Sequence, residues 1–299
     1  MAATSSPSLT VALVAAASSL SLTVAFALAA SLLFGLSDFL GALASRTRSA
    51  LQVTAFMQVS ALAIMLPLAA ARGSDGLMAG DIGLGVLGGL ATALANVVFF
   101  AALGKGRVSL VVPVTAAVGA VVPASIGLLE GTALSTLTAA GAVCGVIAIP
   151  LVAYQRDEDR SGAEWPVARQ LAAAAVAGAG FGLFYVLLSR TSEGSGLWPT
   201  VSTLVVAASI TVAIALLRGM RDLRPPRVVV ASGLLLGAAQ ACLTIALQRG
   251  PLTVASVLGS LYPLVTVVLG VIMFRERLRS WHSLGIALAL AGVALIAAG

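Results

Sequence analysis

Asp38 is a carboxylate within an apolar stretch, and it stands eight residues before the basic residue Arg46. At about 1.5 Å per helical residue, it lies about 12 Å inside the end of a helix. An ionised carboxylate at that depth costs roughly 2.5–3.5 kcal/mol, so we expect it to face a wet cavity, find a partner or become protonated. It could bind a substrate amine or exchange a proton. The alternative is a hydrogen bond to Ser37, Gln58 or another helix that only fixes packing.

Asn96 and Gln240 are carboxamides 144 residues apart, each near the middle of an apolar segment. Two donor-acceptor groups that face each other across a pseudo-twofold axis suit the binding of a polar or zwitterionic metabolite. The alternative is an interhelical hydrogen bond of about 0.6–2 kcal/mol. We predict that both carboxamides line a pocket.

Three aromatic residues accompany these polar groups. Phe100 follows Asn96 by four residues and shares its helical face, while Tyr185 and Tyr262 place phenols inside later apolar segments. Such rings can form the apolar walls of a substrate site and attract an ammonium group over their faces. Simple packing between helices is the alternative for each ring.

Certain glycines and prolines are candidates for lining a cavity or for allowing helices to bend. Most of the 31 glycines supply small faces for helix packing, but Gly35 and Gly182 are candidates for lining a cavity. Pro113 and Pro263 interrupt the hydrogen-bond ladders of two helices, which permits bends on which gating could depend. Fixed kinks are the alternative.

The ends of apolar segments carry two further acids. Glu130 and Glu276 are predicted to be structural corners at the membrane surfaces, with a coupling or gating role as the alternative. The two cysteines, Cys144 and Cys242, lie in apolar segments, and His282 is the single histidine. We therefore expect no metal site and no cofactor.

Composition places these residues in a membrane. Of 299 residues, 60% are hydrophobic and 9% charged, and the mean hydropathy is +1.08. Long unalternating apolar runs favour helices, so the predicted fold is an all-α integral membrane protein. The net charge of +6 comes from basic residues scattered between apolar runs, which indicates membrane topology and no nucleic-acid partner.

About 20 apolar residues cross a bilayer, and the chain offers ten such segments. They are 24–45, 51–71, 82–104, 108–129, 132–154, 167–189, 198–217, 228–248, 252–274 and 281–298. The predicted organisation is an uncleaved tail (1–23), a five-helix repeat (24–154), a linker (155–166) and a second five-helix repeat (167–299). Because five is odd, the second repeat enters the bilayer from the opposite face, and the repeats are inverted.

The two halves share short patterns. The run 102–109 (ALGKGRVS) recurs 144 residues later as 246–253 (ALQRGPLT), and the triplet Phe-Gly-Leu occurs at 34–36 and 181–183. Basic residues add an orientation: all but Arg72, Arg190 and Arg249 of the 17 fall on one predicted side. The positive-inside rule makes that side cytoplasmic and places both termini outside.

These elements resemble the drug/metabolite transporter superfamily, in particular its ten-helix members with two EamA-type repeats. Halves of that family begin with an aromatic-Gly pair, matched by 34–35 and 181–182, and contain a Gly-Glu-like corner. Here the corner reads Leu129-Glu130 and Arg275-Glu276, without the glycine. Members are usually drawn with cytoplasmic termini, opposite to the charge count.

The resemblance implies a permease of the inner or plasma membrane. We expect it to export small polar metabolites or amino-acid-like solutes by alternating access, with protons as a candidate coupling ion. Its expected partners are the solute and membrane lipids, and it could be a monomer or a homodimer. A membrane-embedded enzyme acting on a lipid or hydrophobic substrate is the main alternative, yet the chain has no zinc-protease, nucleophile-elbow or Walker motif. A non-transporting scaffold is the third possibility.

Overall fold

The computed structural model describes residues 9–130, 135–153, 163–219, 224–249, 258, 261–276 and 280–298. Its α-helices are α1 (Leu9–Ser45), α2 (Ala50–Arg72), α3 (Ala79–Lys105), α4 (Val108–Leu129), α5 (Thr136–Ala153), α6 (Val167–Ser189), α7 (Trp198–Leu217), α8 (Arg227–Arg249), α10 (Tyr262–Phe274) and α11 (Ser280–Ala298). A short 3-10 helix, η2 (Glu193–Ser195), precedes α7. The described residues contain no strand, which confirms the all-α class.

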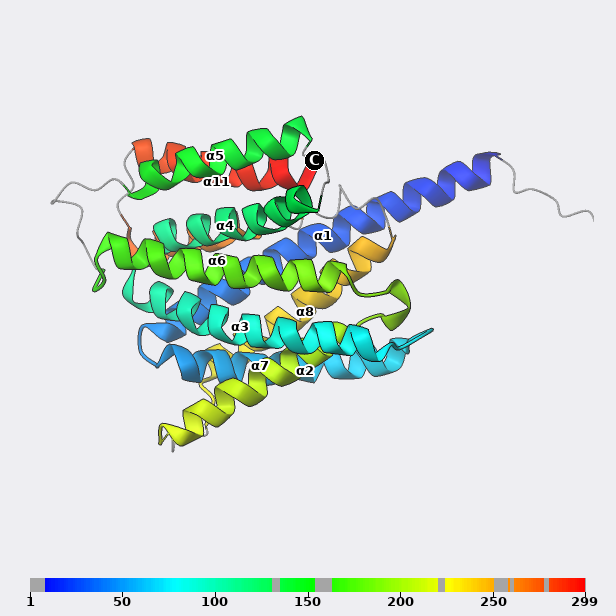
Figure 1. Ribbon diagram of the computed structural model, residues 1–299, viewed down its shortest axis with the longest axis horizontal. Helices are drawn as coiled ribbons and strands as arrows, with labels where there is room; N and C mark the ends of the chain where they lie inside the picture. The colour runs from blue at the N-terminus through cyan, green and yellow to red at the C-terminus, as the bar shows by residue number, and fades with distance from the viewer. Residues whose placement is uncertain are drawn as a thin grey trace, which may run out of the picture.

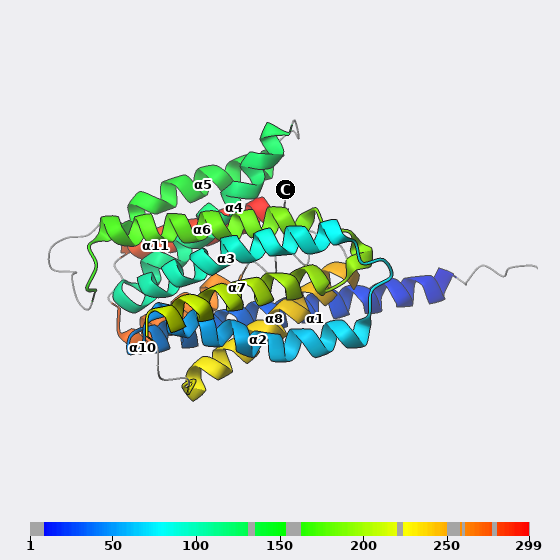
Figure 2. The same ribbon diagram turned by 60° about the horizontal axis from the view of Figure 1, so that its bottom comes forward.

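The helices lie where the apolar segments predict them. Helices α4, α6 and α7 have the predicted bounds, and α2, α3 and α8 are one to three residues longer at their ends. Helix α1 differs, because it begins at Leu9 and takes in much of the predicted tail. Its apolar, membrane-compatible part is Ser21–Ser45, close to the predicted span. In both views the beginning of α1 extends beyond the other helices (Figures 1 and 2).

Six of the described helices are long and apolar enough to cross a membrane: the Ser21–Ser45 part of α1, α2, α3, α6, α7 and the Arg227–Ala246 part of α8. Helices α4, α5, α10 and α11 contain shorter apolar stretches. Many large apolar side chains face outward, among them Leu32, Leu94 and Ile272, which are 54%, 60% and 69% exposed. Such a surface is stable in lipid and would aggregate in water, so the chain is an integral membrane protein.

The helices run in broadly similar directions as one bundle (Figure 1). Helices α5 and α11 pack against each other at one edge of the view in Figure 1, and α2 and α7, which also pack against each other, lie at the opposite edge. Helix α1 packs against α8 and α10, while α6 packs against α3 and α4. The first helix of each half therefore packs against the third and fourth helices of the other half.

Glycines set the close contacts between the halves, and they do so in matching pairs. A Cβ on Gly35 would lie 2.4 Å from Cβ of Val265 in α10, and one on Gly182 would lie 2.7 Å from Cβ of Val122 in α4. Gly89 packs in the same way on Val206 of α7. At these glycines the helices approach so closely that a side chain would not fit. Small residues commonly allow such close packing of helices in a bilayer.

The matching glycine of α8 is Gly233, 144 residues after Gly89. A Cβ there would lie 2.6 Å from Cβ of Ser60 in α2, as one on Gly89 would lie 2.6 Å from Cβ of Val206 in α7. Helix α3 thus packs on α7 through the same local geometry by which α8 packs on α2.

Candidate functional site

Asp38 lies on the face of α1 that points into the bundle. Its neighbours on the helix fix this orientation: Gly35 packs on α10, Ser37 bonds to α8 and Gly41 packs on Phe100 of α3. Exposed Leu32 and Leu36 mark the lipid-facing stripe on the other side of the helix. The Asp38 side chain is partly accessible, and it has no hydrogen bond or ion pair to any residue in the described part of the chain.

Two phenols from the second half lie near this carboxylate. Asp38 interacts electrostatically with Tyr185 of α6 and with Tyr262 of α10, and the two phenols interact with each other. The Phe34 ring stands 5.8 Å from the Tyr262 ring, centroid to centroid, so the aromatic surface continues along α1. One acid and three rings from α1, α6 and α10 therefore share one region of the bundle interior.

Tyr185 is 42% exposed although it points away from the lipid. On α6 the lipid-facing stripe consists of exposed Ala172, Val176, Ala179 and Leu183, spaced three or four residues apart. A helix turns 100° per residue, so Tyr185 lies about 160° around α6 from Leu183, next to Gly182 on the side that packs against α4. We infer that its exposed surface opens to space inside the bundle.

Asn96 and Gln240 have partly accessible side chains. The Asn96 amide nitrogen donates to the backbone oxygen of Thr92 at 2.9 Å, within its own helix. The Gln240 amide oxygen is buried and has no hydrogen-bond partner in the described part of the chain. A buried carbonyl without a partner is unfavourable by about 1–3 kcal/mol, so it favours a bound polar group or water.

Gln240 stands between two packing faces of α8. Ser232 lies on the face toward α1, and Gly233 and Gly237 lie on the face toward α2. The position of Gln240 on the helix falls next to the α2 face and on its inward side. The carboxamide therefore points between α1 and α2, away from exposed Leu234.

Three other predicted site residues lie in helix interfaces and are almost completely buried. Ser37 and Ser232 exchange hydrogen bonds, each hydroxyl donating to the other's backbone oxygen at 2.8 and 2.7 Å. The Gln58 amide oxygen accepts a hydrogen bond from the Thr211 hydroxyl of α7 at 3.3 Å. Phe100 is 1% exposed and packs on Gly41. The structure places these three residues apart from the accessible inward surface.

The prolines occupy different places in their helices. Pro113 lies inside α4, as predicted, together with Pro123. Pro263 is the second residue of α10 as described, where a proline is compatible with the helix because its missing N–H would be unpaired anyway. The part of the predicted span before residue 261 lies outside the described residues, except for Leu258.

Glu276 caps the start of α4. Its two carboxylate oxygens accept hydrogen bonds from the backbone N–H groups of Val108 (2.8 Å) and Ser109 (3.0 Å). A carboxylate at a helix N-terminus satisfies unpaired donors and interacts favourably with the helix dipole. The predicted structural corner is thus a tie between α10 and α4.

Arg46 joins the same corner, a contact that the sequence reading did not identify. Its guanidinium stacks 3.6 Å from the centroid of the Phe274 ring. Partial burial lowers the pKa of Arg46, and the Glu276 carboxylate acts in the opposite direction. The end of α1 is therefore bound to the end of α10.

The matching corner lies at the other end of the bundle. Arg190, at the end of α6, forms an ion pair with Glu130, at the end of α4. Arg190 follows Arg46 by 144 residues and Glu276 follows Glu130 by 146, so the two pairs are related by similar spacings. These spacings are the sequence signal from which Arg46 and Arg190 could have been predicted as matching corner residues.

A second polar cluster lies near Arg190. The Asp81 carboxylate in the first turn of α3 accepts hydrogen bonds from the Ser192 hydroxyl and backbone N–H, and from the Ser195 hydroxyl at 2.5 Å. The loop before α3 also bonds to Gly194 through backbone groups. This cluster ties the two halves together at the end of the bundle, and no spacing in the sequence pointed to it.

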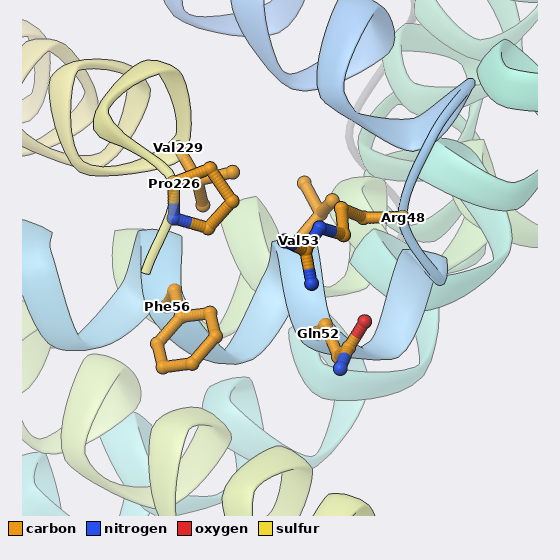
Figure 3. Close-up of a pocket in the computed structure, with 6 residues that line it drawn as sticks. All are labelled: Arg48, Gln52, Val53, Phe56, Pro226 and Val229. Carbon is orange, nitrogen blue, oxygen red and sulfur yellow. The ribbon is translucent and has the colours of Figure 1, made fainter. Parts of the chain in front are cut away.

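A shallow pocket lies at the beginning of α2 and α8. It has an empty volume of about 180 Å³, including space open to solvent, and is lined by Arg48, Gln52, Val53, Phe56, Pro226 and Val229 (Figure 3). None of the predicted site residues contributes to it. Ligand sites for drug-sized molecules usually enclose about 300–1,000 Å³, so this pocket is smaller than such a site.

Residues 168–298 match the EamA-like transporter family. The second half of the chain is therefore similar to this family. It contains Tyr185, Gln240 and Tyr262, while Asp38 and Asn96 precede the matched residues. The match supports a membrane transporter of the drug/metabolite type, consistent with the resemblance found in the sequence.

The fold of the chain is similar to that of a solved structure titled "Crystal structure of protein". The similarity covers 92% of this chain and 96% of that chain, with a TM-score of 0.62 and 19% sequence identity. It shows a common fold over both halves. No curated protein matches the chain.

Proposed function

We propose that this protein is a secondary active transporter that moves small polar solutes across a membrane by alternating access. The observation that carries the proposal is the accessible inward surface formed by Asp38, Tyr185 and Tyr262 within an apolar helical bundle. An ionisable side chain within a membrane protein more often lines a solute or ion pathway than contacts lipid. The family match of the second half supports the same function.

The proposal includes ten membrane crossings arranged as two inverted five-helix repeats. The matching glycine contacts support it, since Gly35 and Gly182, and likewise Gly89 and Gly233, pack on equivalent helices of the opposite half. Many transporters with inverted repeats bind their substrate at the repeat interface near the bilayer midplane. The inward surface around Asp38 draws residues from both halves, as such a site requires.

Alternating access needs contacts that close each end in turn. The pairs Arg46–Glu276 and Arg190–Glu130 are suited to this task because each joins the first helix of one half to the fourth helix of the other. Arg190 and Glu130 are about half exposed, so their ion pair is weak enough to break. Glu276, as a helix cap, is the more permanent tie.

Three further features of the proposal come from the family resemblance and not from the contacts. They are outward transport, the polar-metabolite class of the solute, and residence in the inner or plasma membrane. Proton coupling, with Asp38 as the proton carrier, is also part of the proposal, because a carboxylate within an apolar segment can exchange a proton. The chain is assigned no catalytic residue.

Reconstitution into vesicles tests the transport function. Purified protein is incorporated into liposomes, and uptake of a panel of radiolabelled amines, amino acids and other polar metabolites is followed with and without a pH gradient. We expect saturable uptake of at least one solute above protein-free vesicles, reduced at least tenfold by Asp38→Asn. If no solute of the panel enters these vesicles faster than it enters protein-free vesicles, the proposal of a transporter is refuted.

A further inference from the structure

Between their first and last turns, the described helices contain one acidic side chain and no basic one. Asp38 is the only acid within the middle of an apolar segment. Every Lys, Arg and His in the described residues lies in a helix's first or last turn or in a connection. The stretch 250–261 contributes no basic residue either, because its sequence is GPLTVASVLGSL. The inward surface therefore lacks a cation that could pair with a substrate carboxylate.

The groups around Asp38 suit a positive ligand. The Asp38 carboxylate interacts electrostatically with the phenols of Tyr185 and Tyr262 and disfavours a second negative charge near it. The faces of Tyr185, Tyr262 and Phe34 carry the negative part of the aromatic quadrupole, which attracts ammonium groups within about 6 Å. A cation bound here would interact favourably with both the carboxylate and the ring faces.

A zwitterion is less well matched. The amino group of an amino acid could reach Asp38, but its carboxylate would lie among the middle turns of the helices, where the described residues include no basic side chain. Burial of an unpaired charge is strongly unfavourable. The amides of Asn96 and Gln240 could serve as neutral donors, but one of the two hydrogens of the Asn96 nitrogen is already donated to Thr92.

We propose that the substrate is an organic monocation, an amine or quaternary ammonium compound with an apolar body, and that the carboxylate of Asp38 and the rings of Tyr185, Tyr262 and Phe34 bind it. The apolar body would lie on the ring faces and the charged nitrogen beside the carboxylate. This inference rests on the proposed transport function and narrows the class of solute. Because binding can be measured without transport, the two statements fail separately.

The test uses phenyltrimethylammonium, a permanent aromatic monocation, in equilibrium binding to the full-length protein in detergent. We expect saturable binding, displaced by excess phenethylamine but not by equal concentrations of phenylalanine or hydrocinnamate. Asp38→Asn should weaken binding at least tenfold, whereas Asp38→Glu should retain most of it. Asp75→Asn is the matched control, since Asp75 is an exposed loop acid, and it should leave binding unchanged.

A second variant pair separates the aromatic face from the hydroxyl. Tyr185→Phe should keep binding within about twofold, and Tyr185→Leu should weaken it several-fold; this pair decides the matter if Asp38→Asn does not purify as a monodisperse protein. No saturable binding, equal displacement by phenylalanine, or full affinity in Asp38→Asn would overturn the cation site. Uptake of other solutes by vesicles would then leave the transport function intact.

Discussion

Asp38 and Tyr185 occupy equivalent positions on α1 and α6, and their side chains interact electrostatically. They are 147 residues apart, the same offset that relates the Phe-Gly pair 34–35 to the pair 181–182. The two first helices thus present different chemistry at one matched position, an acid in one half and a phenol in the other. In the proposed site, this difference would allow an asymmetric solute to bind in one orientation.

The glycine contacts between the halves predict a sharp difference between two conservative substitutions. Gly182→Ala should lower the free energy of unfolding of the purified protein by more than about 1 kcal/mol, and its melting temperature with it. The reason is that the new Cβ would lie 2.7 Å from Val122 and 2.8 Å from the Gly119 oxygen. Gly83→Ala is the control, since a Cβ there meets nothing within 4 Å. Equal melting temperatures for the two variants would contradict this packing.

The two corner glutamates should differ in their contribution to stability. Glu276→Ala removes the cap of α4 and should reduce the free energy of unfolding by about 1–2 kcal/mol. Glu130→Ala breaks an exposed ion pair, worth about 0–1 kcal/mol. Denaturation of both variants in detergent compares them, and a larger loss for Glu130→Ala would be inconsistent with the capping role.

Arg275 holds a backbone conformation that favours glycine. Its φ of 53° and ψ of 40° are left-handed, at the position where the resembling family has glycine. Arg275→Gly should therefore stabilise the protein by a few tenths to about 1 kcal/mol, after the larger entropy of glycine in the unfolded chain is subtracted. Arg218→Gly, at a helix end with φ of −83°, should give no gain.

The carboxamides are predicted to contact the solute. Asn96→Ala and Gln240→Ala should each change the apparent affinity in vesicle uptake while the protein stays folded. Gln58→Ala should instead lower thermal stability, because Gln58 is buried and bonded to Thr211. Wild-type uptake kinetics in both Asn96→Ala and Gln240→Ala would show that these amides only join helices.

Much of the fold could be predicted from the sequence because a bilayer restricts the choices. Apolar segments of about 20 residues must be helices, and most described helices begin and end within three residues of their predicted bounds. Helix α1 begins at Leu9, well before its predicted start. Its first residues were assigned to a tail because Ser and Thr dilute the apolar pattern there, yet these residues do not prevent helix formation.

The site was harder to predict because residue type does not give helical rotation. Asp38 and Ser37 are adjacent in the sequence, but one side chain is partly accessible and the other is locked against Ser232. Phe100 shared a face with Asn96 by spacing, yet it fills the gap left by Gly41. Which face of a helix meets a neighbour depends on contacts between distant segments, and one sequence does not contain that information.

The most direct test of the account is the water accessibility of Tyr185 compared with that of Leu183. Both side chains are 42% exposed, but they point to opposite sides of α6. Cys144 and Cys242 are first replaced by serine, and Tyr185 or Leu183 is then changed to cysteine. Labelling by a charged, membrane-impermeant thiol reagent is measured with the reagent present on both sides of the vesicle membrane.

The account predicts rapid labelling of Tyr185→Cys, slowed by a transported solute, and no labelling of Leu183→Cys, which faces lipid. Labelling of Leu183→Cys with Tyr185→Cys unreactive would contradict an accessible inward surface, and with it the proposed transport site.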